Sequence, residues 1–314
     1  QSGPLKGEVV ISGAKNAVLP LMAAALLAED TCVIRDVPKL RDVSFMKELL
    51  TSLGSEIEEL EENVLSVSTK DILSTEAQFE LVNKMRASIL VMGPLLARKG
   101  RARIPHPGGC AIGSRPIDLH LKGLEALGAV ITSTDTYVEA VAGAQGLVGD
   151  TIYLDFPSVG ATENIMLAAV LAEGTTVVTN AAREPEICDL CGFLNACGAR
   201  IFGAGEGRIV IEGVEKLTGT EHHVIPDRIA ATTFMTAAAV TGGDLLLRRV
   251  VPDHLSQVIP MFQEAGCRLR WDDANLRIQA PQRLRAVKSV RTMPYPGFPT
   301  DAQAPMMAMT TVSD

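Results

Sequence analysis

One segment of the sequence gathers residues that could carry out chemistry on a flexible loop. In PHPGGCAIGSRPIDLH, residues 105–120, Cys110 follows two glycines and precedes Arg115 by five positions. The glycines disfavour a regular helix or strand, so a mobile surface loop is predicted. Cysteine is usually buried, whereas a thiol on a loop beside a cation is typical of reactive cysteines. The segment therefore indicates a reactive thiol, with a chance surface cysteine as the alternative.

Charged residues recur where apolar helical patterns begin. The patterns start near SGAKNAVLP, MRASILVMGP, PDRIAATTF and PTDAQAPMM. The charged residues at corresponding positions of these starts are Lys15, Arg86, Arg228 and Asp301. A cation opposes the macrodipole at a helix start, but it is favourable there when an anion also binds the free backbone N–H groups. The three cations are therefore predicted to line a phosphate or carboxylate pocket. The alternative is that each is a solvated residue at a helix end.

An internal repeat explains why these helix starts recur. Alanine-rich runs, each followed by a strand-like segment, end at Asp30, Gly100, Gly174 and Gly243. A second helical pattern in each unit ends at a glycine, the usual signal of a helix C-terminus. These glycines are Gly54, Gly128, Gly198 and Gly266. Each unit of roughly 70 residues is predicted to be strand, helix, strand, helix and one or two further strands.

The repeat also predicts how the helices are buried and where the chain stops. The first helix of each unit is apolar on nearly every face, so we expect sheets to enclose it. A chain of 314 residues that is 47% hydrophobic can bury two cores, which predicts two domains. The last segment, PTDAQAPMMAMTTVSD, matches the first helix of a fifth unit. We therefore expect the rest of that unit to be missing.

Charge and motif content exclude several classes of protein. A net charge of −8 argues against a nucleic-acid or anionic-lipid footprint. The apolar run AVLPLMAAALLA is too short to span a bilayer and follows a strand-like segment, so we expect a cytoplasmic protein with reduced thiols. No nucleotide-hydrolysis, dinucleotide or zinc-protease motif occurs. Cys188, Cys191 and Cys197 lie on one helical pattern without a second ligand pair, so they are predicted to be core residues and not a metal site.

Eight segments together resemble the UDP-N-acetylglucosamine 1-carboxyvinyltransferase family of enolpyruvyl transferases. They are SGAKNA, VPKLRDV, MRAS, PGGCAIGSRPIDLH, SVGATENIM, AAREPEI, PDRI and FPTDAQA, and they follow in order along the whole chain. The resemblance implies an α/β fold of two inside-out barrels, built from βαββαβ-type units with buried helices. It implies one domain from residues 15–224 and a second from residues 1–14 plus 225–314. About a quarter of the family's usual chain would then be missing.

The resemblance also implies a reaction and its residues. The enolpyruvyl group of phosphoenolpyruvate would pass to the 3-hydroxyl of UDP-N-acetylglucosamine with release of phosphate, the committed step of peptidoglycan synthesis in the cell wall. No cofactor is implied. Cys110 would be the loop acid and Asp301 the base, while Lys15, Arg86 and Arg115 hold phosphoenolpyruvate. The residues implied to contact or support the UDP-sugar are Asn16, Arg115, Pro116, Ile117, Asp118, Leu119, His120, Ser158, Val159, Gly160 and Arg228.

Two alternatives remain at this point. 3-Phosphoshikimate 1-carboxyvinyltransferase shares the fold and the donor substrate, but it lacks a loop like PGGCAIGSRP. A non-catalytic relative could keep the fold and bind a UDP-sugar without turning it over. The residue types at Lys15, Cys110 and Asp301 favour an enzyme, because they supply a cation, an acid and a base.

Overall fold

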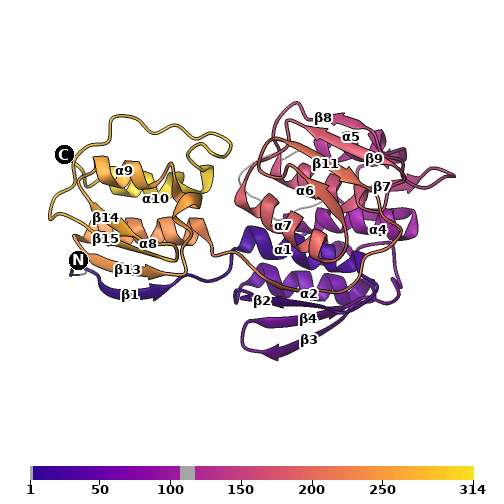
Figure 1. Ribbon diagram of the computed structural model, residues 1–314, viewed down its shortest axis with the longest axis horizontal. Helices are drawn as coiled ribbons and strands as arrows, with labels where there is room; N and C mark the ends of the chain where they lie inside the picture. Colours follow the sequence, from indigo (N-terminus) through magenta and orange to yellow (C-terminus); the bar gives the residue numbers. More distant parts are fainter. Residues whose placement is uncertain (1–2, 107–116) are drawn as a thin grey trace. The chain divides into compact units, whose positions relative to one another are not determined.

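The computed structural model describes residues 3–106 and 117–314, and the chain in it divides into two compact units. Lys15–Val224 form the larger unit, and Gln1–Ala14 together with Ile225–Asp314 form the smaller unit. Both contain helices and strands, so the fold is mixed α/β, as predicted (Figure 1). The assignment of each unit to a functional domain remains a prediction.

The larger unit repeats one order of elements. The first repeat contains α1 (Lys15–Ala24), η1 (Ala25–Leu27), β2 (Cys32–Arg35), α2 (Arg41–Leu53), β3 (Glu56–Glu61) and β4 (Val64–Ser68). The second contains α3 (Phe79–Val82), η2 (Arg86–Val91), α4 (Met92–Lys99), β5 (Arg101–Pro105), α5 (Asp118–Ala126), β6 (Ala129–Ser133), β7 (Tyr137–Ala142) and β8 (Thr151–Tyr153). The third contains α6 (Val159–Ala169), β9 (Thr175–Thr179), α7 (Pro185–Ala196), β10 (Arg200–Phe202), β11 (Arg208–Glu212) and β12 (Glu221–His223).

Strands shared between repeats hold the larger unit together. Its sheets have the strand orders β12-β2-β4-β3, β5-β7-β6 and β10-β11-β9-β8. Strand β8 of the second repeat pairs in parallel with β9 of the third, and β12 of the third returns to pair in parallel with β2 of the first. At the remaining junction, Glu76 forms a parallel bridge with Arg103. The three repeats therefore form a closed series.

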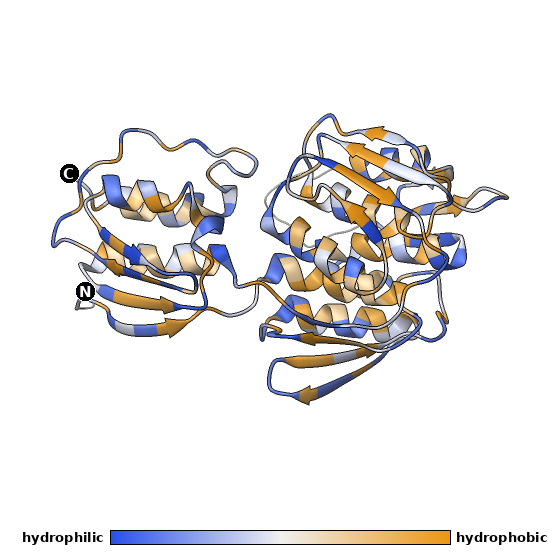
Figure 2. Ribbon diagram, in the orientation of Figure 1, coloured by the Kyte–Doolittle hydropathy of each residue, from blue (hydrophilic) through white to orange (hydrophobic). Residues whose placement is uncertain are grey.

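Two helices of the larger unit are enclosed, as their apolar sequences predict. Every residue of α1 from Ala17 to Ala24 is buried, and so is every residue of α6 from Ala161 to Ala169. Figure 2 shows α1 beginning with hydrophilic residues and continuing in apolar colours. The polar start of α1 is the part of the helix that stays accessible.

The predicted glycine signals also occur where the second helices end. All four glycines have positive φ angles, which a residue without a Cβ adopts without strain. The angles are +114° at Gly54, +89° at Gly128, +102° at Gly198 and +94° at Gly266. The prediction of these helix ends is confirmed.

The smaller unit is built on one four-stranded sheet. Its elements are β1 (Lys6–Val10), α8 (Arg228–Thr241), β13 (Asp244–Arg248), η3 (Pro252–Leu255), α9 (Ile259–Glu264), β14 (Arg268–Trp271), β15 (Asn275–Gln279), η4 (Thr300–Ala302) and α10 (Gln303–Thr310). The strand order is β1-β13-β15-β14, with β1 parallel to β13. Helix α8 packs against this sheet and α10.

The prediction that every first helix is enclosed is wrong for α8. Met235 and Ala238 are buried on the side of the sheet, but Phe234 and Val240 are each 38% exposed. Within the described part of the chain, the elements packed on α8 cover only one side of it. An apolar sequence therefore did not suffice to predict enclosure.

The described residues contain five free cysteines, of which Cys188 is exposed and the other four are buried. The prediction of a core position is therefore correct for Cys191 and Cys197 and wrong for Cys188. Among these same residues, no group of three or more His, Cys, Asp or Glu side chains could hold a metal ion. None of the described helices is long and apolar enough to cross a membrane.

Candidate active site

Lys15 and Asn16 lie at the accessible start of α1. Lys15 is the first residue of the helix, and its Nζ lies 3.5 Å from Oδ2 of Asp42 on α2. Asn16 is exposed. A lysine at a helix start adds positive charge to the positive end of the macrodipole, which is favourable beside an anion. The carboxylate of Asp42 provides part of that compensation.

Three predicted site regions meet at the start of α6. Ser158 is the N-cap of α6, and its side chain accepts a hydrogen bond of 3.3 Å from the Ala161 N–H. The imidazole of His120, in the first turn of α5, lies against Gly160: a Cβ at Gly160 would be only 3.1 Å from Cε1 and 3.2 Å from Nε2. The charge of Arg86, at the start of η2, acts on the same ring.

The surroundings of His120 keep its imidazole neutral. The residue is only 4% exposed. Burial, together with the positive charge of Arg86, lowers the pKa of His120 to about 4, although Asp118 acts in the opposite direction. At neutral pH the ring therefore carries one N–H donor and one acceptor nitrogen.

A buried asparagine that the sequence analysis did not single out contacts this ring. The Nδ2 of Asn164, on α6, lies 3.1 Å from Nδ1 of His120 and donates to the Ile89 carbonyl oxygen at 3.1 Å. Its Oδ1 accepts from the Gly93 N–H at 2.8 Å. The signal in the sequence was a run of polar residues, Thr162 to Asn164, within a mostly apolar helix, because buried polar groups need partners.

Glu163 is a buried acidic residue next to Asn164 in α6. It is 4% exposed, and burial raises its pKa well above the usual value for a glutamate, with further increases from Glu186 and Glu184. Glu186, on α7, is 3% exposed. Burial of this kind disfavours the charged form of the carboxyl.

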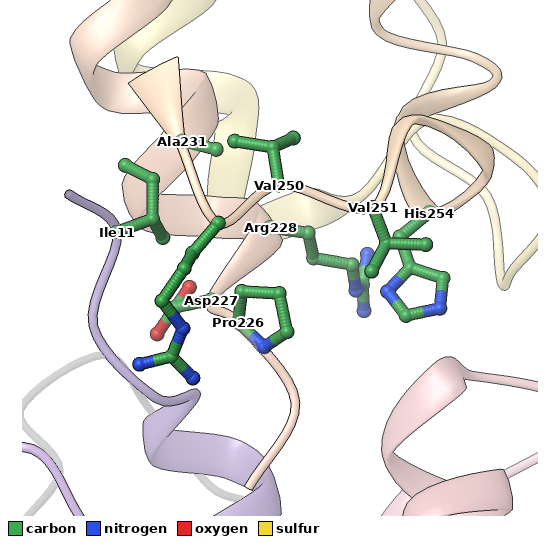
Figure 3. Close-up of a pocket in the computed structure, with 9 residues that line it drawn as sticks. Ile11, Pro226, Asp227, Arg228, Ala231, Val250, Val251 and His254 are labelled. Carbon is green, nitrogen blue, oxygen red and sulfur yellow. The ribbon is translucent and has the colours of Figure 1, made fainter. Parts of the chain in front are cut away.

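Arg228 and Asp301 lie in the smaller unit. Arg228 is the first residue of α8, and Asp227 caps that helix by accepting from the N–H groups of Ile229 and Ala230 at 2.8 and 2.9 Å. The Arg228 guanidinium lies over the ring of Tyr295, 5.6 Å from its centroid. Arg228 and His254 are among the residues that line a small pocket at the start of α8 (Figure 3).

Asp301 is exposed within the short helix η4, which leads directly into α10. It therefore lies at the start of the fifth helical pattern, at the position that the repeat predicts. An exposed carboxylate at such a place can accept a proton from a bound molecule.

The remaining predicted residues lie in or beside the loop segment. Cys110, Arg115 and Pro116 fall outside the described residues. Ile117 is the N-cap of α5, Asp118 is its first residue, and Leu119 follows as a half-buried residue. The structure thus brings Arg86, His120 and the start of α6 together within the larger unit.

The grouping around α6 is suited to binding an oxyanion. The start of a helix offers unpaired backbone N–H groups and the positive end of the macrodipole. A neutral imidazole adds an N–H donor, and the Arg86 guanidinium adds charge. A phosphate or carboxylate fits this combination of groups.

Comparisons with known proteins agree with this chemistry. A model of the family described as EPSP synthase (3-phosphoshikimate 1-carboxyvinyltransferase) matches residues 1–314. UDP-N-acetylglucosamine 1-carboxyvinyltransferase 1 of Caldanaerobacter subterraneus subsp. tengcongensis is 56% identical over 313 residues, which are 100% of this chain and 74% of that protein. UDP-N-acetylglucosamine 1-carboxyvinyltransferase of Finegoldia magna is 52% identical over 310 residues, 98% of this chain and 73% of that one.

Solved structures show the same fold. The enolpyruvyl transferase NikO from Streptomyces tendae superimposes with a TM-score of 0.88 at 21% identity, over 100% of this chain and 74% of its own. EPSP synthase from Acinetobacter baumannii superimposes with a TM-score of 0.73 at 23% identity, over 98% of this chain and 71% of its own. At these identities the superpositions establish the fold alone.

Proposed function

We propose that this chain transfers the enolpyruvyl group of phosphoenolpyruvate to UDP-N-acetylglucosamine. The premise is that the chain belongs to the EPSP synthase (3-phosphoshikimate 1-carboxyvinyltransferase) family of enolpyruvyl transferases. The acceptor is the 3-hydroxyl of the sugar, the second product is phosphate, and the product serves peptidoglycan synthesis. The observation that carries this choice is 56% identity along the whole chain to a UDP-N-acetylglucosamine 1-carboxyvinyltransferase. A cytoplasmic location remains a prediction.

The reaction sets four chemical requirements. A proton is added to the methylene carbon of phosphoenolpyruvate, and the sugar hydroxyl attacks the adjacent carbon and loses its own proton. A proton then leaves the new methyl group as the C–O bond to phosphate breaks, which restores the double bond. These steps need an acid, a base and cations for the phosphate and carboxylate.

Residues of this chain can be assigned to each requirement. We assign the acid to Cys110, the base to Asp301, and the binding of phosphoenolpyruvate to Lys15, Arg86 and Arg115. Support comes from Lys15 and Arg86 at helix starts of the larger unit, where an anion is favoured.

The UDP-sugar is assigned to the group of residues at α5 and α6. Asn16 and residues 115–120 would contact it, with Ser158, Val159 and Gly160 near its diphosphate or uridine and Arg228 supporting the site. The Ser158 cap and the packing of His120 on Gly160 support this assignment, since they place an imidazole beside the first turn of α6. We further propose that the larger unit is an inside-out barrel, which the enclosed helices α1 and α6 support.

Phosphate release tests the acceptor. The chain is incubated with phosphoenolpyruvate and either UDP-N-acetylglucosamine or shikimate 3-phosphate, and free phosphate is measured. We expect release with the UDP-sugar and none with shikimate 3-phosphate, which is the acceptor named by the family description. Release with shikimate 3-phosphate alone would assign the chain to the other reaction. Binding of UDP-N-acetylglucosamine without release would favour a non-catalytic relative.

A further inference from the structure

We infer that Asn164 is a positioning residue for His120: it fixes Nδ1 of the imidazole as an acceptor, so that the Nε2–H is directed to a phosphate oxygen of the UDP-sugar at the start of α6. This inference rests on the proposed function for the identity of the ligand. The arrangement of Asn164 and His120 is independent of it.

Two backbone groups determine which way the Asn164 amide faces. The Gly93 N–H can only donate, so the atom 2.8 Å from it must be the amide oxygen. The Ile89 carbonyl can only accept, so the atom 3.1 Å from it must be the amide nitrogen. The orientation, which is otherwise ambiguous for an asparagine, is therefore set by chemistry.

The amide in turn determines the tautomer of His120. The Asn164 Nδ2 carries two hydrogens, of which one points to Ile89 and the other to the imidazole Nδ1 at 3.1 Å. A protonated Nδ1 would place two donors against each other in a buried position. The neutral ring therefore carries its proton on Nε2. The same repulsion acts against the imidazolium and adds to the effects of burial and of Arg86, which lower the pKa of His120 to about 4.

The remaining ring edge lies at the start of α6. A Cβ at Gly160 would meet Cε1 and Nε2, so the absence of a side chain there allows the Nε2–H edge to lie against the first turn of the helix. Within the residues that the structure describes, the ring makes its hydrogen bond through Nδ1, to Asn164. A donor fixed in this way, beside free N–H groups of a helix start, is complementary to a phosphate oxygen.

The packing around Asn164 fixes its position. Asn164 is fully buried. A Cβ on Gly93 would lie 2.6 Å from the Asn164 carbonyl oxygen, and a Cβ on Gly123 would lie 2.3 Å from Ile165 side-chain atoms. Helices α4 and α5 therefore both approach α6 closely at this level, and one side chain links all three.

The first half of the inference, that His120 carries its proton on Nε2, can be tested on the wild-type protein. Long-range 15N–1H correlation spectra of histidine-labelled protein distinguish the two neutral tautomers, and His120→Gln identifies the signals of His120 among the five histidines. We expect a single Nε2–H tautomer that persists from pH 8 to pH 6. A wild-type His120 with its proton on Nδ1 would overturn the inference without any ligand or folding complication.

Asn164→Asp tests the second half. The carboxylate replaces the Nδ2 donor by an acceptor, so His120 should move its proton to Nδ1, and the dissociation constant for UDP-N-acetylglucosamine measured by calorimetry should rise about tenfold. Affinity for phosphoenolpyruvate should stay within about twofold. A matched loss for both ligands would contradict a specific role at the UDP-sugar.

Asn195→Asp is the control for the chemical change itself, made at an exposed asparagine. Asn195, on α7, bonds the backbone in the same manner, with Oδ1 accepting from the Ile201 N–H and Nδ2 donating to the Ile201 carbonyl, each at 2.9 Å. Because Asn195 is exposed, the substitution should lower stability less than Asn164→Asp, and it should leave the His120 tautomer and both affinities unchanged. Equal effects of the two substitutions on affinity would reduce Asn164 to a structural role.

His120→Gln separates positioning from folding. Its side chain can place an N–H near the former Nε2 without needing an acceptor at Nδ1, so affinity should fall less than in Asn164→Asp. Adding Asn164→Asp to the His120→Gln variant should not weaken UDP-N-acetylglucosamine binding by a further tenfold. A full additional loss of affinity would show that Asn164 does not act through His120. If the wild type fails to bind UDP-N-acetylglucosamine, the proposed function fails, and the spectra still decide whether Asn164 sets the tautomer.

Discussion

Helices α6 and α8 begin corresponding repeats with similarly apolar sequences, yet their surroundings differ. Residues 161–169 of α6 are all buried, and three of them are the polar residues Thr162, Glu163 and Asn164. Helix α8 buries Met235 and Ala238 but leaves Phe234 and Val240 partly exposed. An enclosed helix must supply a partner or a neutral form for each polar side chain, whereas a helix with one open side can direct such groups to water.

The largest expected difference between α6 and α8 is in the free energy of unfolding that is lost when a charged side chain is introduced into the helix. Leu167→Asp in α6 removes a fully buried side chain and introduces a carboxylate with no partner, so the free energy of unfolding should fall by about 4 kcal/mol or more. Val240→Asp in α8 should change it by less than about 1 kcal/mol, since the site is 38% exposed. Urea unfolding followed by circular dichroism measures both. Equal losses would show that α8 is as enclosed as α6.

The buried carboxyl of Glu163 should make stability depend on pH in an unusual direction. Because its pKa is raised in the folded chain, folding becomes less favourable as the pH rises above the unfolded value of about 4.3, by up to about 1.4 kcal/mol per pH unit until the folded pKa is reached. Glu163→Gln removes this loss. The variant should be more stable than wild type at pH 7 to 8, and the difference should shrink towards pH 4. A difference that stays constant over this range would contradict a buried neutral Glu163.

The smaller unit contains a carboxyl whose pKa is lowered and not raised, and whose effect on stability should be smaller. Asp244, on β13, accepts two hydrogen bonds of 2.8 Å from Arg277 on β15, and this pairing, with a further bond from Gln279, lowers the pKa of Asp244 to about 2. A lowered pKa stabilises the fold above the unfolded value, and the benefit is lost as the pH falls towards about 2.

Asp244→Asn should therefore cost about 0.5 to 1 kcal/mol at pH 6 to 8, because the pair is partly solvated. The difference from wild type should disappear between pH 4 and pH 2. Thermal unfolding across this range measures it, with 1 M salt as a control that should reduce the effect. A difference that grows on acidification would show that the Arg277 pairing is not its source.

The repeat was readable from the sequence because its signals are local. A helix that ends at Gly54 or Gly198 needs a residue that tolerates positive φ, and this requirement involves only neighbouring residues. Helix starts at Lys15 and Arg228 follow from the same periodic pattern. Features that depend on a few adjacent residues could therefore be predicted in every repeat.

The partners of Asn164 could not be predicted in this way. Ile89, Gly93 and His120 lie 75, 71 and 44 residues earlier in the chain, and only the packing of three helices brings them together. The open side of α8 is a similar case, because it depends on which elements pack against the helix. The roles of Cys110 and Arg115 remain predictions from the resemblance.

The way in which the larger unit interrupts the smaller one constrains the order of folding. Strand β1 needs β13 as its parallel partner, and more than 230 residues separate Lys6 from Asp244. The Ala14 N–H donates to the Ile225 carbonyl at 2.8 Å, so the residues that flank the larger unit lie next to each other. Once the larger unit has folded, this long loop is already closed, and the entropy cost of about 5 kcal/mol for joining its ends no longer opposes β1–β13 pairing. During synthesis, β1 therefore lacks its β13 partner until the larger unit has been made, so rapid folding of that unit shortens the time for which the edge of β1 is exposed.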